Sequence, residues 1–197
     1  MPNPAEQIAD EILVMDAQGG DREAFDLLVL RWQKRFWRHA FHLTGGIEAA
    51  WDIAQESWLD IVRGLTSLND AARFGAWAYR IVSHNAYDWR RRHGRELSPE
   101  IEPGSASAAA TEPAEDETAS GIHDILRRLP ASAQVVLNLH YLEGFGLAEI
   151  AGILGSPKGT VKSRLHAARI EFKKVWESLA KRAPAATPGS GNESRHE

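Results

Sequence analysis

An acidic stretch rich in alanine and serine divides the sequence into two parts. Residues 96–120 (ELSPEIEPGSASAAATEPAEDETAS) contain seven Asp or Glu, no Lys or Arg, and few large apolar side chains. A segment of this composition cannot bury enough apolar surface to offset the conformational entropy lost on folding. We therefore predict a flexible acidic linker over 96–120 between two folded domains, at 21–95 and 121–180. Residues 1–20 are expected to be an N-terminal lead-in, and residues 181–197 a disordered tail.

The charge of the chain is segregated along the sequence. The formal net charge is −4, which by itself argues against nucleic-acid binding. However, residues 72–95 and residues 157–174 each carry six Lys or Arg against a single Asp or Glu. These two basic segments predict a cationic surface in each domain.

Other features exclude several classes of protein. The chain has no cysteine, which rules out disulfides, thiolate metal sites and cysteine nucleophiles. No apolar run approaches the roughly 18 residues of a membrane span, and the N-terminus lacks the basic start of a signal peptide. We therefore expect a cytoplasmic protein without a membrane partner. No catalytic constellation is present, and His39 and His42 alone do not indicate a metal site, so we expect no enzyme activity, no cofactor and no metal.

The first domain is predicted to be a helical bundle. Apolar residues recur at three- and four-residue spacing after Asp21, a suitable N-cap, until Gly45 and Gly46 interrupt the pattern. A second helix is expected from about Glu48 to Leu65, and a third after Asn69 or Asp70. The expected inward residues are Phe25, Leu28, Val29, Trp32, Phe36, Ala40 and Leu43, then Ala50, Ile53, Ala54, Ile61, Val62 and Leu65, then Phe74, Trp77, Ala78, Ile81, Val82 and Trp89. No strand-like alternation interrupts these helices, which predicts an all-α fold.

The second expected helix carries an acidic stripe. Glu48, Asp52, Glu56 and Asp60 recur every four residues, with Gln55 beside them. Like charges at this spacing destabilise a helix by roughly 0.2–0.5 kcal/mol per pair. The residues alone leave three interpretations open: a solvated face, a docking surface for a basic partner, or a catalytic carboxylate pair, for which no burying cleft is indicated.

The third expected helix presents cations and an aromatic ring on its outward face. These residues are Arg73, Arg80, His84, Tyr87 and Arg91. Cations follow phosphates, while rings and guanidinium planes stack on exposed bases, so the mixture is typical of single-stranded nucleic-acid binding. A solvated helix face with Tyr87 partly buried fits the residues equally well.

The second domain contains a helix-turn-helix pattern. A short helix begins at Ala148, Gly155 and Ser156 form a tight turn, and a basic helix opens near Pro157. The expected inward residues are Ile153, Leu154, Val161, Leu165 and Ala168, and the expected outward ones are Lys158, Lys162, Ser163 and His166. Outward residues in the first turns of such a helix meet bases and phosphates in the major groove, which favours duplex DNA binding over a merely solvated helix.

In order along the chain, these fragments resemble an extracytoplasmic-function sigma factor, a small two-domain initiation subunit of bacterial RNA polymerase. The resemblance covers about Asp21 to Trp176. The similar residues are Asp52–Glu56, Phe74–Ile81, Asp88 and Arg90–Arg92 in the first domain, and Leu129–Pro130, Tyr141–Gly144, Glu149–Ala151 and Pro157–Leu165 in the second. Each fragment alone is weak, but their order around an acidic linker is specific.

The resemblance implies a sigma2-like bundle, a sigma4-like helix-turn-helix domain and three binding surfaces. The core-polymerase surface, which would dock on the β′ clamp helices, comprises Glu48, Asp52, Gln55, Glu56 and Asp60. The surface that recognises and helps melt the minus-ten promoter element comprises Leu68, Arg73, Trp77, Arg80, His84, Asn85, Tyr87 and Arg91. The surface that reads the minus-thirty-five element as duplex comprises Lys158, Thr160, Lys162, Ser163, Arg164 and His166.

The implied partners are core RNA polymerase, at its β′ clamp helices and β flap, and promoter DNA; an anti-sigma protein is a further candidate. This sequence departs from the family at three positions. Asn85 stands one position after the usual asparagine, where this chain has His84. Leu68 replaces a frequent aromatic residue, and Ala167 occupies a position that is often basic.

Two other functions compete with this interpretation. A stand-alone helix-turn-helix regulator would bind duplex promoter DNA without polymerase, but it leaves the acidic stripe unexplained. A sigma-mimicking adaptor that sequesters an anti-sigma partner usually carries a receiver domain, whose βα alternation is missing here.

Overall fold

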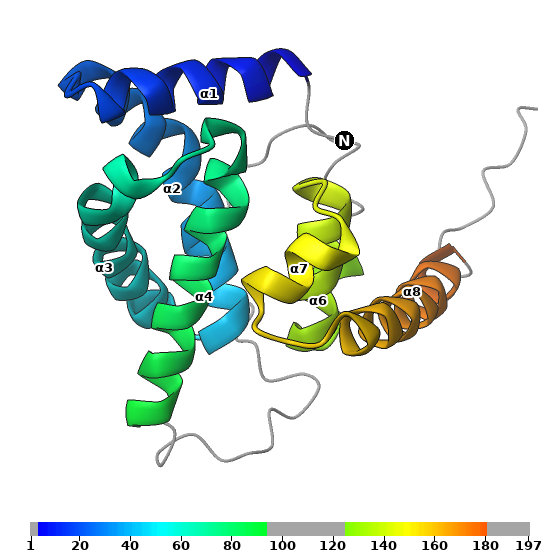
Figure 1. The fold of residues 1–197 in the computed structure, drawn as a ribbon. Helices are drawn as coiled ribbons and strands as arrows, with labels where there is room; N and C mark the ends of the chain where they lie inside the picture. The colour runs from blue at the N-terminus through cyan, green and yellow to red at the C-terminus, as the bar shows by residue number, and fades with distance from the viewer. Residues whose placement is uncertain (1–3, 94–124, 181–197) are drawn as a thin grey trace, which may run out of the picture.

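The computed structural model describes residues 4–93 and 125–180, and every regular element in these two ranges is helical (Figure 1). The first domain contains α1 (Pro4–Gln18), α2 (Arg22–Thr44), α3 (Ile47–Gly64), the short 3₁₀ turns η1 (Leu65–Ser67) and η2 (Ala71–Arg73), and α4 (Phe74–His93). The second contains α6 (Ala131–Leu137), the π-helical turn η3 (Asn138–Leu142), α7 (Leu147–Ile153) and α8 (Lys158–Ala180). The predicted all-α fold is confirmed. The predicted linker over 96–120 and tail over 181–197 lie outside the described ranges.

The ends of the helices follow the capping residues identified in the sequence. Asp21 caps α2, because its Oδ1 accepts the N–H groups of Glu23 at 2.8 Å and Ala24 at 3.2 Å. Gly45 ends α2 with a φ of 75°, a left-handed conformation that glycine adopts without strain. Asp70 accepts the N–H of Ala72 at 3.1 Å, so this predicted cap starts η2, immediately before α4.

Aromatic residues from α2 and α4 form the centre of the first domain. The ring centroids of Trp32 and Phe74 lie 5.4 Å apart, as do those of Phe36 and Tyr79, and both pairs meet edge to face. Most predicted inward residues are buried, Phe25, Trp77, Ile81 and Trp89 are partly buried against this core, and Val29 is half-buried. The prediction for Val62 is wrong, since its side chain is 52% exposed. It follows the fully buried Ile61, and each helical residue turns the side chain by about 100°.

The expected lead-in contains a helix, α1, that packs on α2. Val14 is fully buried, and Arg31 Nε of α2 lies 2.6 Å from Asp10 Oδ1. Gln18 Nε2 donates to the carbonyl oxygens of Leu65 and Leu68 at 2.8 and 2.7 Å. No helix was predicted for this segment. Its apolar residues occupy two opposite faces: those near Val14 pack inward, whereas Ile8, Ile12 and Met15 are exposed.

The second domain has the predicted helix-turn-helix. All five of its predicted inward residues are buried, and Gly155 adopts a φ of 58° in the turn between α7 and α8. Ser156 N–H closes the turn by donating to Ala151 O at 3.0 Å. α6 packs against α2, and α7 packs against α4, so the two domains are in contact (Figure 1).

Candidate protein and nucleic-acid interfaces

The acidic residues of α3 lie along an exposed face of that helix. Four of the five predicted core-polymerase residues are exposed: Glu48, Asp52, Gln55 and Glu56. Asp60 is half-buried, and its two oxygens lie 3.4 Å from Arg63 Nη1 and 3.1 Å from Asn85 Nδ2, which donates to it. Glu56 Oε2 is 3.9 Å from Arg92 Nη2, a loose contact between exposed side chains that contributes little to stability. The first four residues are thus available to a partner, whereas Asp60 also supports the fold.

Large apolar side chains accompany these charges. Trp51, Leu59 and Val62 are 48%, 58% and 52% exposed. Their positions in the sequence place them on the side of α3 that also carries Asp52 and Gln55. We call this surface the α3 ridge: Glu48, Trp51, Asp52, Gln55, Glu56, Leu59 and Val62. The apolar part of this surface was not predicted from the sequence, although the four-residue spacing of Trp51, Gln55 and Leu59 was a signal for it.

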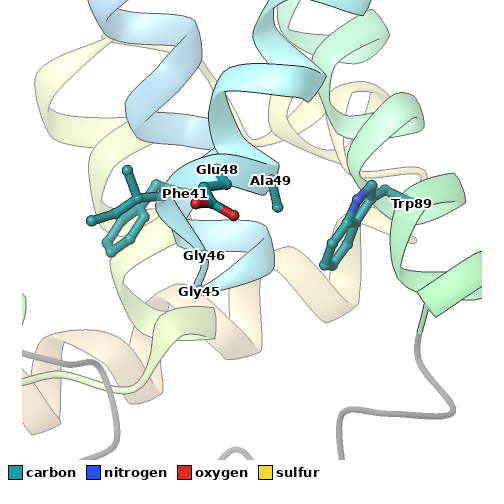
Figure 2. Close-up of a pocket in the computed structure, with 7 residues that line it drawn as sticks. Phe41, Gly45, Gly46, Glu48, Ala49 and Trp89 are labelled. Carbon is teal, nitrogen blue, oxygen red and sulfur yellow. The ribbon is translucent and has the colours of Figure 1, made fainter.

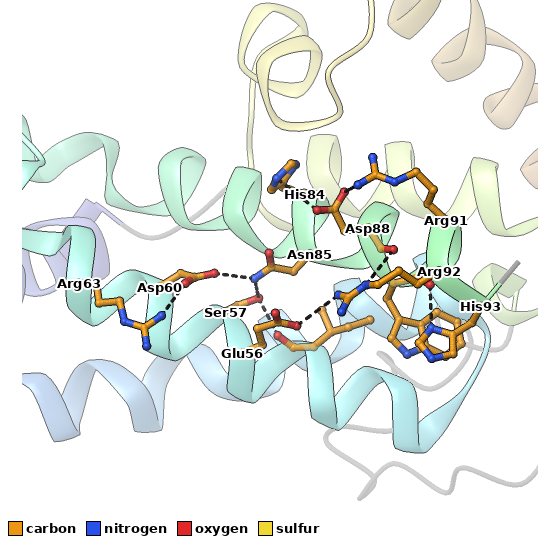
Figure 3. A network of polar contacts seen from close by, with 12 residues as sticks. Glu56, Ser57, Asp60, Arg63, His84, Asn85, Asp88, Arg91, Arg92 and His93 are labelled. Atoms are coloured by element: carbon orange, nitrogen blue, oxygen red, sulfur yellow. Dashed lines mark hydrogen bonds and ion pairs between the residues drawn. The ribbon is translucent and has the colours of Figure 1, made fainter.

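The predicted cations of α4 lie on its solvent side. Arg73, Arg80, His84, Tyr87 and Arg91 are all exposed. Arg73 Nε lies 3.1 Å from Asp70 Oδ2. Asp88 stands between His84, at 3.6 Å, and Arg91, at 3.1 Å (Figure 3). Within the described ranges, Arg80 has no carboxylate partner, so its guanidinium is free to meet a phosphate or a base.

Asn85 does not share this face, contrary to its assignment to the DNA surface. It is only 7% exposed, and its Nδ2 donates to Ser57 Oγ at 3.2 Å and to Asp60 Oδ2 at 3.1 Å (Figure 3). These bonds tie α4 to α3. The physical reason is the rotation of about 100° per helical residue, which directs His84 to solvent and its neighbour into the helix contact.

Leu68 and Trp77 form a half-buried apolar border beside the cations of α4. Leu68 follows η1, and both side chains pack against the core. A methyl group on Gly64 would lie 3.0 Å from the Trp77 ring, so the close approach of this ring to α3 needs a glycine there. The structure therefore exposes five of the eight predicted minus-ten residues on η2 and α4, leaves Leu68 and Trp77 half-buried, and turns Asn85 inward.

The first turns of α8 present the predicted minus-thirty-five residues. Lys158, Lys162, Ser163, Arg164 and His166 are exposed, and Thr160 is half-buried. Ser163 Oγ donates to Thr160 O at 2.9 Å. In the part of the chain that the structure describes, no carboxylate pairs with Lys158, Lys162 or Arg164. The buried Val161 and Leu165 fix the opposite face of the helix and so hold these cations outward.

A hollow of about 480 Å³ opens between the start of α3 and the end of α4 (Figure 2). It is lined by Phe41, Gly45, Gly46, Ile47, Glu48, Ala49 and Trp89. Glu48 is the single titratable side chain in this lining, so the hollow offers no acid–base pair.

His39 is a buried packing residue. It is fully buried, and its Nε2 lies 2.8 Å from Ser83 Oγ, whose own hydrogen is donated to Tyr79 O at 2.8 Å. Burial, with a smaller contribution from His42, lowers the pKa of His39 from 6.5 to about 3. Across residues 4–93 and 125–180, no three His, Cys, Asp or Glu side chains are grouped to hold a metal ion. No helix there combines the length and apolarity needed to cross a bilayer.

Comparison with known proteins identifies the family. Residues 28–96 match the family described as Sigma-70 region 2, and residues 120–171 match Sigma-70, region 4. RNA polymerase sigma-H factor of Pseudomonas aeruginosa is 30% identical over 190 residues, which cover 90% of this chain and 98% of that protein. The chain belongs to the sigma-70 family. Within it, this sigma factor is similar to the extracytoplasmic-function group. ECF RNA polymerase sigma-E factor of Escherichia coli strain K12 is 28% identical over 191 residues, which cover 90% of this chain and all of that protein.

Solved structures share the fold of this sigma factor. One, the sigma factor RpoE in complex with the anti-sigma factor NepR from Bartonella quintana, has a TM-score of 0.61 at 23% identity and covers 78% of this chain and 96% of that chain. Another, CnrH in complex with the cytosolic domain of CnrY, has a TM-score of 0.56 at 23% identity and covers 86% of this chain and 98% of that chain.

The family assignment establishes the function at the level of the whole chain. This sigma factor binds core RNA polymerase and directs promoter-specific transcription initiation. The stand-alone regulator considered above does not account for the match of the first domain to Sigma-70 region 2.

Proposed function

We propose that three surfaces divide the work of this sigma factor. The α3 ridge docks on the β′ clamp helices of core polymerase, the exposed face of α4 with η2 and Leu68 holds the melted minus-ten element, and the start of α8 reads the minus-thirty-five element in the major groove. The observation that carries the proposal is the segregation of charge. Carboxylates and large apolar side chains are exposed together on α3, while the exposed side chains of α4 and of the start of α8 include several cations.

The composition of the α3 ridge supports a protein partner. Stable interfaces combine a desolvated apolar centre with a charged rim, and Trp is enriched among the residues that dominate binding energy. Trp51 and Leu59 supply the apolar part, and Asp52 and Glu56 supply a charge that a basic partner would neutralise. The partner would also relieve the repulsion between carboxylates on successive turns.

The remaining assignments follow from this division. The sigma factor positions and opens promoter DNA, and polymerase supplies the catalysis, so the chain itself performs no covalent chemistry. It acts in the cytoplasm, where polymerase transcribes. An anti-sigma protein is a further proposed partner, because two sigma factors of similar fold have been solved in such complexes. The proposed domain limits are 21–95 and 121–180, with the helix α1 packed on the first domain as an N-terminal addition.

Charge reversal on the ridge tests the docking assignment. We expect Asp52→Lys combined with Glu56→Lys to abolish binding to purified core polymerase, measured by fluorescence anisotropy of the labelled sigma factor. Both carboxylates are exposed, so circular dichroism should show an unchanged fold. The matched control is Glu23→Lys combined with Asp26→Lys, which makes the same change of charge at exposed positions on α2. Equal core affinity for the two double variants would refute the assignment.

A further inference from the structure

Phe145 of the second domain packs into the surface of the first. It lies between η3 and α7, and its ring meets that of Tyr79 edge to face with centroids 5.5 Å apart. A methyl group on Gly75 of α4 would lie 3.4 Å from Phe145 and 2.8 Å from the Trp32 ring. The close contact therefore depends on a glycine within α4.

A neighbouring ion pair joins the same two domains. Glu143 is 8% exposed, and its Oε2 lies 3.5 Å from Arg35 Nε of α2, while the guanidinium of Arg35 covers the Trp32 ring at 4.7 Å. A well-formed pair of this kind has a separation of about 2.7–2.9 Å. Burial raises the pKa of Glu143, although Arg35, the Tyr79 hydroxyl and Arg38 act in the opposite direction. The ion pair therefore offsets only part of the desolvation cost of its carboxylate.

The second domain presents these two side chains on an ordered turn. Phe145 N–H donates to Leu139 O at 2.9 Å, and His140 Nδ1 lies 3.0 Å from Phe145 O, to which it donates. Gly144 adopts a φ of 76°, which reverses the chain between Glu143 and Phe145. Little conformational entropy is therefore lost when the turn meets the first domain.

The contact brings together surfaces that DNA would hold apart. Arg164, at the start of α8, lies close enough to Tyr87 of α4 to favour its ionised form, against the burial that raises the pKa of Tyr87. These residues belong to the two proposed DNA surfaces. Elements centred near −10 and −35 are about 25 base pairs apart, or about 85 Å along B-DNA at about 3.4 Å per pair. The observed arrangement cannot place both surfaces on their elements at once.

We propose that Phe145 and the Glu143–Arg35 pair form an intramolecular latch that holds the free sigma factor closed, and that the domains separate when polymerase and promoter are bound. The DNA-spacing argument rests on the proposed function, whereas the contact itself does not. Between His93 and Ile125 the chain reaches about 100 Å when fully extended, so separation requires neither domain to unfold. The ion pair is long and offsets only part of the desolvation cost of its carboxylate. The closed form is therefore only modestly more stable than the open form, so polymerase and promoter can open it.

The absence of cysteine allows a direct test in the full chain. Cysteines introduced by Arg90→Cys and Ala167→Cys, both at exposed positions, carry spin labels on α4 and on the first half of α8, which lie near each other in this arrangement, and electron–electron resonance gives the distance between them. We expect one short distance in the free protein. Phe145→Ala should raise the ratio of open to closed molecules about tenfold. Trp176→Ala, which removes an exposed aromatic residue of α8, is the matched control and should leave the distances unchanged.

A pair of variants tests the ionic part of the latch. Arg35→Met removes the ion-pair partner of the buried Glu143, leaves only the weaker effect of Arg38, and should also favour long distances. Adding Glu143→Gln removes the uncompensated charge and should restore the short distance, an effect that general destabilisation of the first domain would not produce. Long distances in the free wild type, or distances in Phe145→Ala and Arg35→Met that match the control, would overturn the proposal.

The same distance measurement in the presence of core polymerase and promoter DNA tests the latch separately from the assignment of the DNA surfaces. Their addition should convert the labelled wild type to a long distance. If the free variants open as expected but the promoter complex stays short, the latch contact stands, its opening on promoter binding is refuted, and the proposed placement of the two DNA surfaces is wrong.

Discussion

At the scale of single residues, the neutral His39 makes the stability of the first domain depend on pH. Its pKa is lowered to about 3 in the folded protein, while the unfolded chain keeps a value near 6.5. Below pH 6.5 the unfolded chain therefore takes up a proton that the folded chain does not. Stability falls as the pH decreases from about 6.5 towards 3, by about 1.4 kcal/mol per pH unit.

We expect this effect to disappear when His39 is replaced. When the pH is lowered from 7 to 5, protonation of His39 in the unfolded chain should decrease the free energy of unfolding of the wild type by about 2 kcal/mol. His39→Leu should lack this decrease, even if the variant is less stable overall. Urea unfolding at the two pH values measures the difference. His93→Leu, at an exposed position, is the control and should keep the wild-type pH dependence. An unchanged dependence in His39→Leu would show that other groups cause it.

At the scale of elements, α8 presents cations on its early turns while its opposite face packs into the domain. Lys162 is exposed there, and no described carboxylate neutralises it. If Lys162 contacts a phosphate, its removal retains the fold but eliminates the release of about one counterion on binding.

Lys162→Ala should therefore weaken promoter binding by the holoenzyme and make it less sensitive to salt. The slope of log affinity against log salt concentration should become smaller in magnitude by about 0.9, measured between 50 and 200 mM salt. Lys173→Ala removes the same charge further along α8, where Glu177 lies 3.7 Å from that lysine, and should leave the slope unchanged. Equal slopes for Lys162→Ala and the wild type would exclude a phosphate contact by Lys162.

At the scale of the whole molecule, the contact between the domains should respond to pH through Glu143. Its pKa is raised in the closed arrangement, where Arg35, Arg38 and Tyr79 face it, and returns towards 4.5 when the domains separate. The closed form therefore binds the proton more tightly. Its extra stability is fully present below pH 4.5 and is lost as the pH rises through the raised pKa of the closed form.

We expect the spin-labelled sigma factor to show a larger closed fraction at pH 5 than at pH 7.5. Glu143→Gln should have the same closed fraction at both pH values, because the amide does not titrate. Circular dichroism at each pH checks that both domains remain folded. A pH response that persists in Glu143→Gln would assign the effect to another group.

The candidate surfaces were predictable wherever a single helix determines them. The sequence correctly placed Arg80, His84 and Lys162 on exposed faces, because helical periodicity and the neighbouring apolar residues decide which side faces the solvent. It failed for Asn85 and Val62. Both lie where the apolar stripe meets the polar face, and there the packing of a neighbouring helix decides which side chain is covered.

The sequence by itself determined the all-α class, the capped start at Asp21 and the helix-turn-helix, because spacing, caps and turn glycines act between residues close in the chain. Only the tertiary structure decided that Asn85 binds Ser57 and Asp60, that residues 4–18 pack on α2, and that Phe145 meets Tyr79. These contacts join segments far apart in the chain. Periodicity within one helix shows which face is apolar, but it contains no information about which distant segment covers that face.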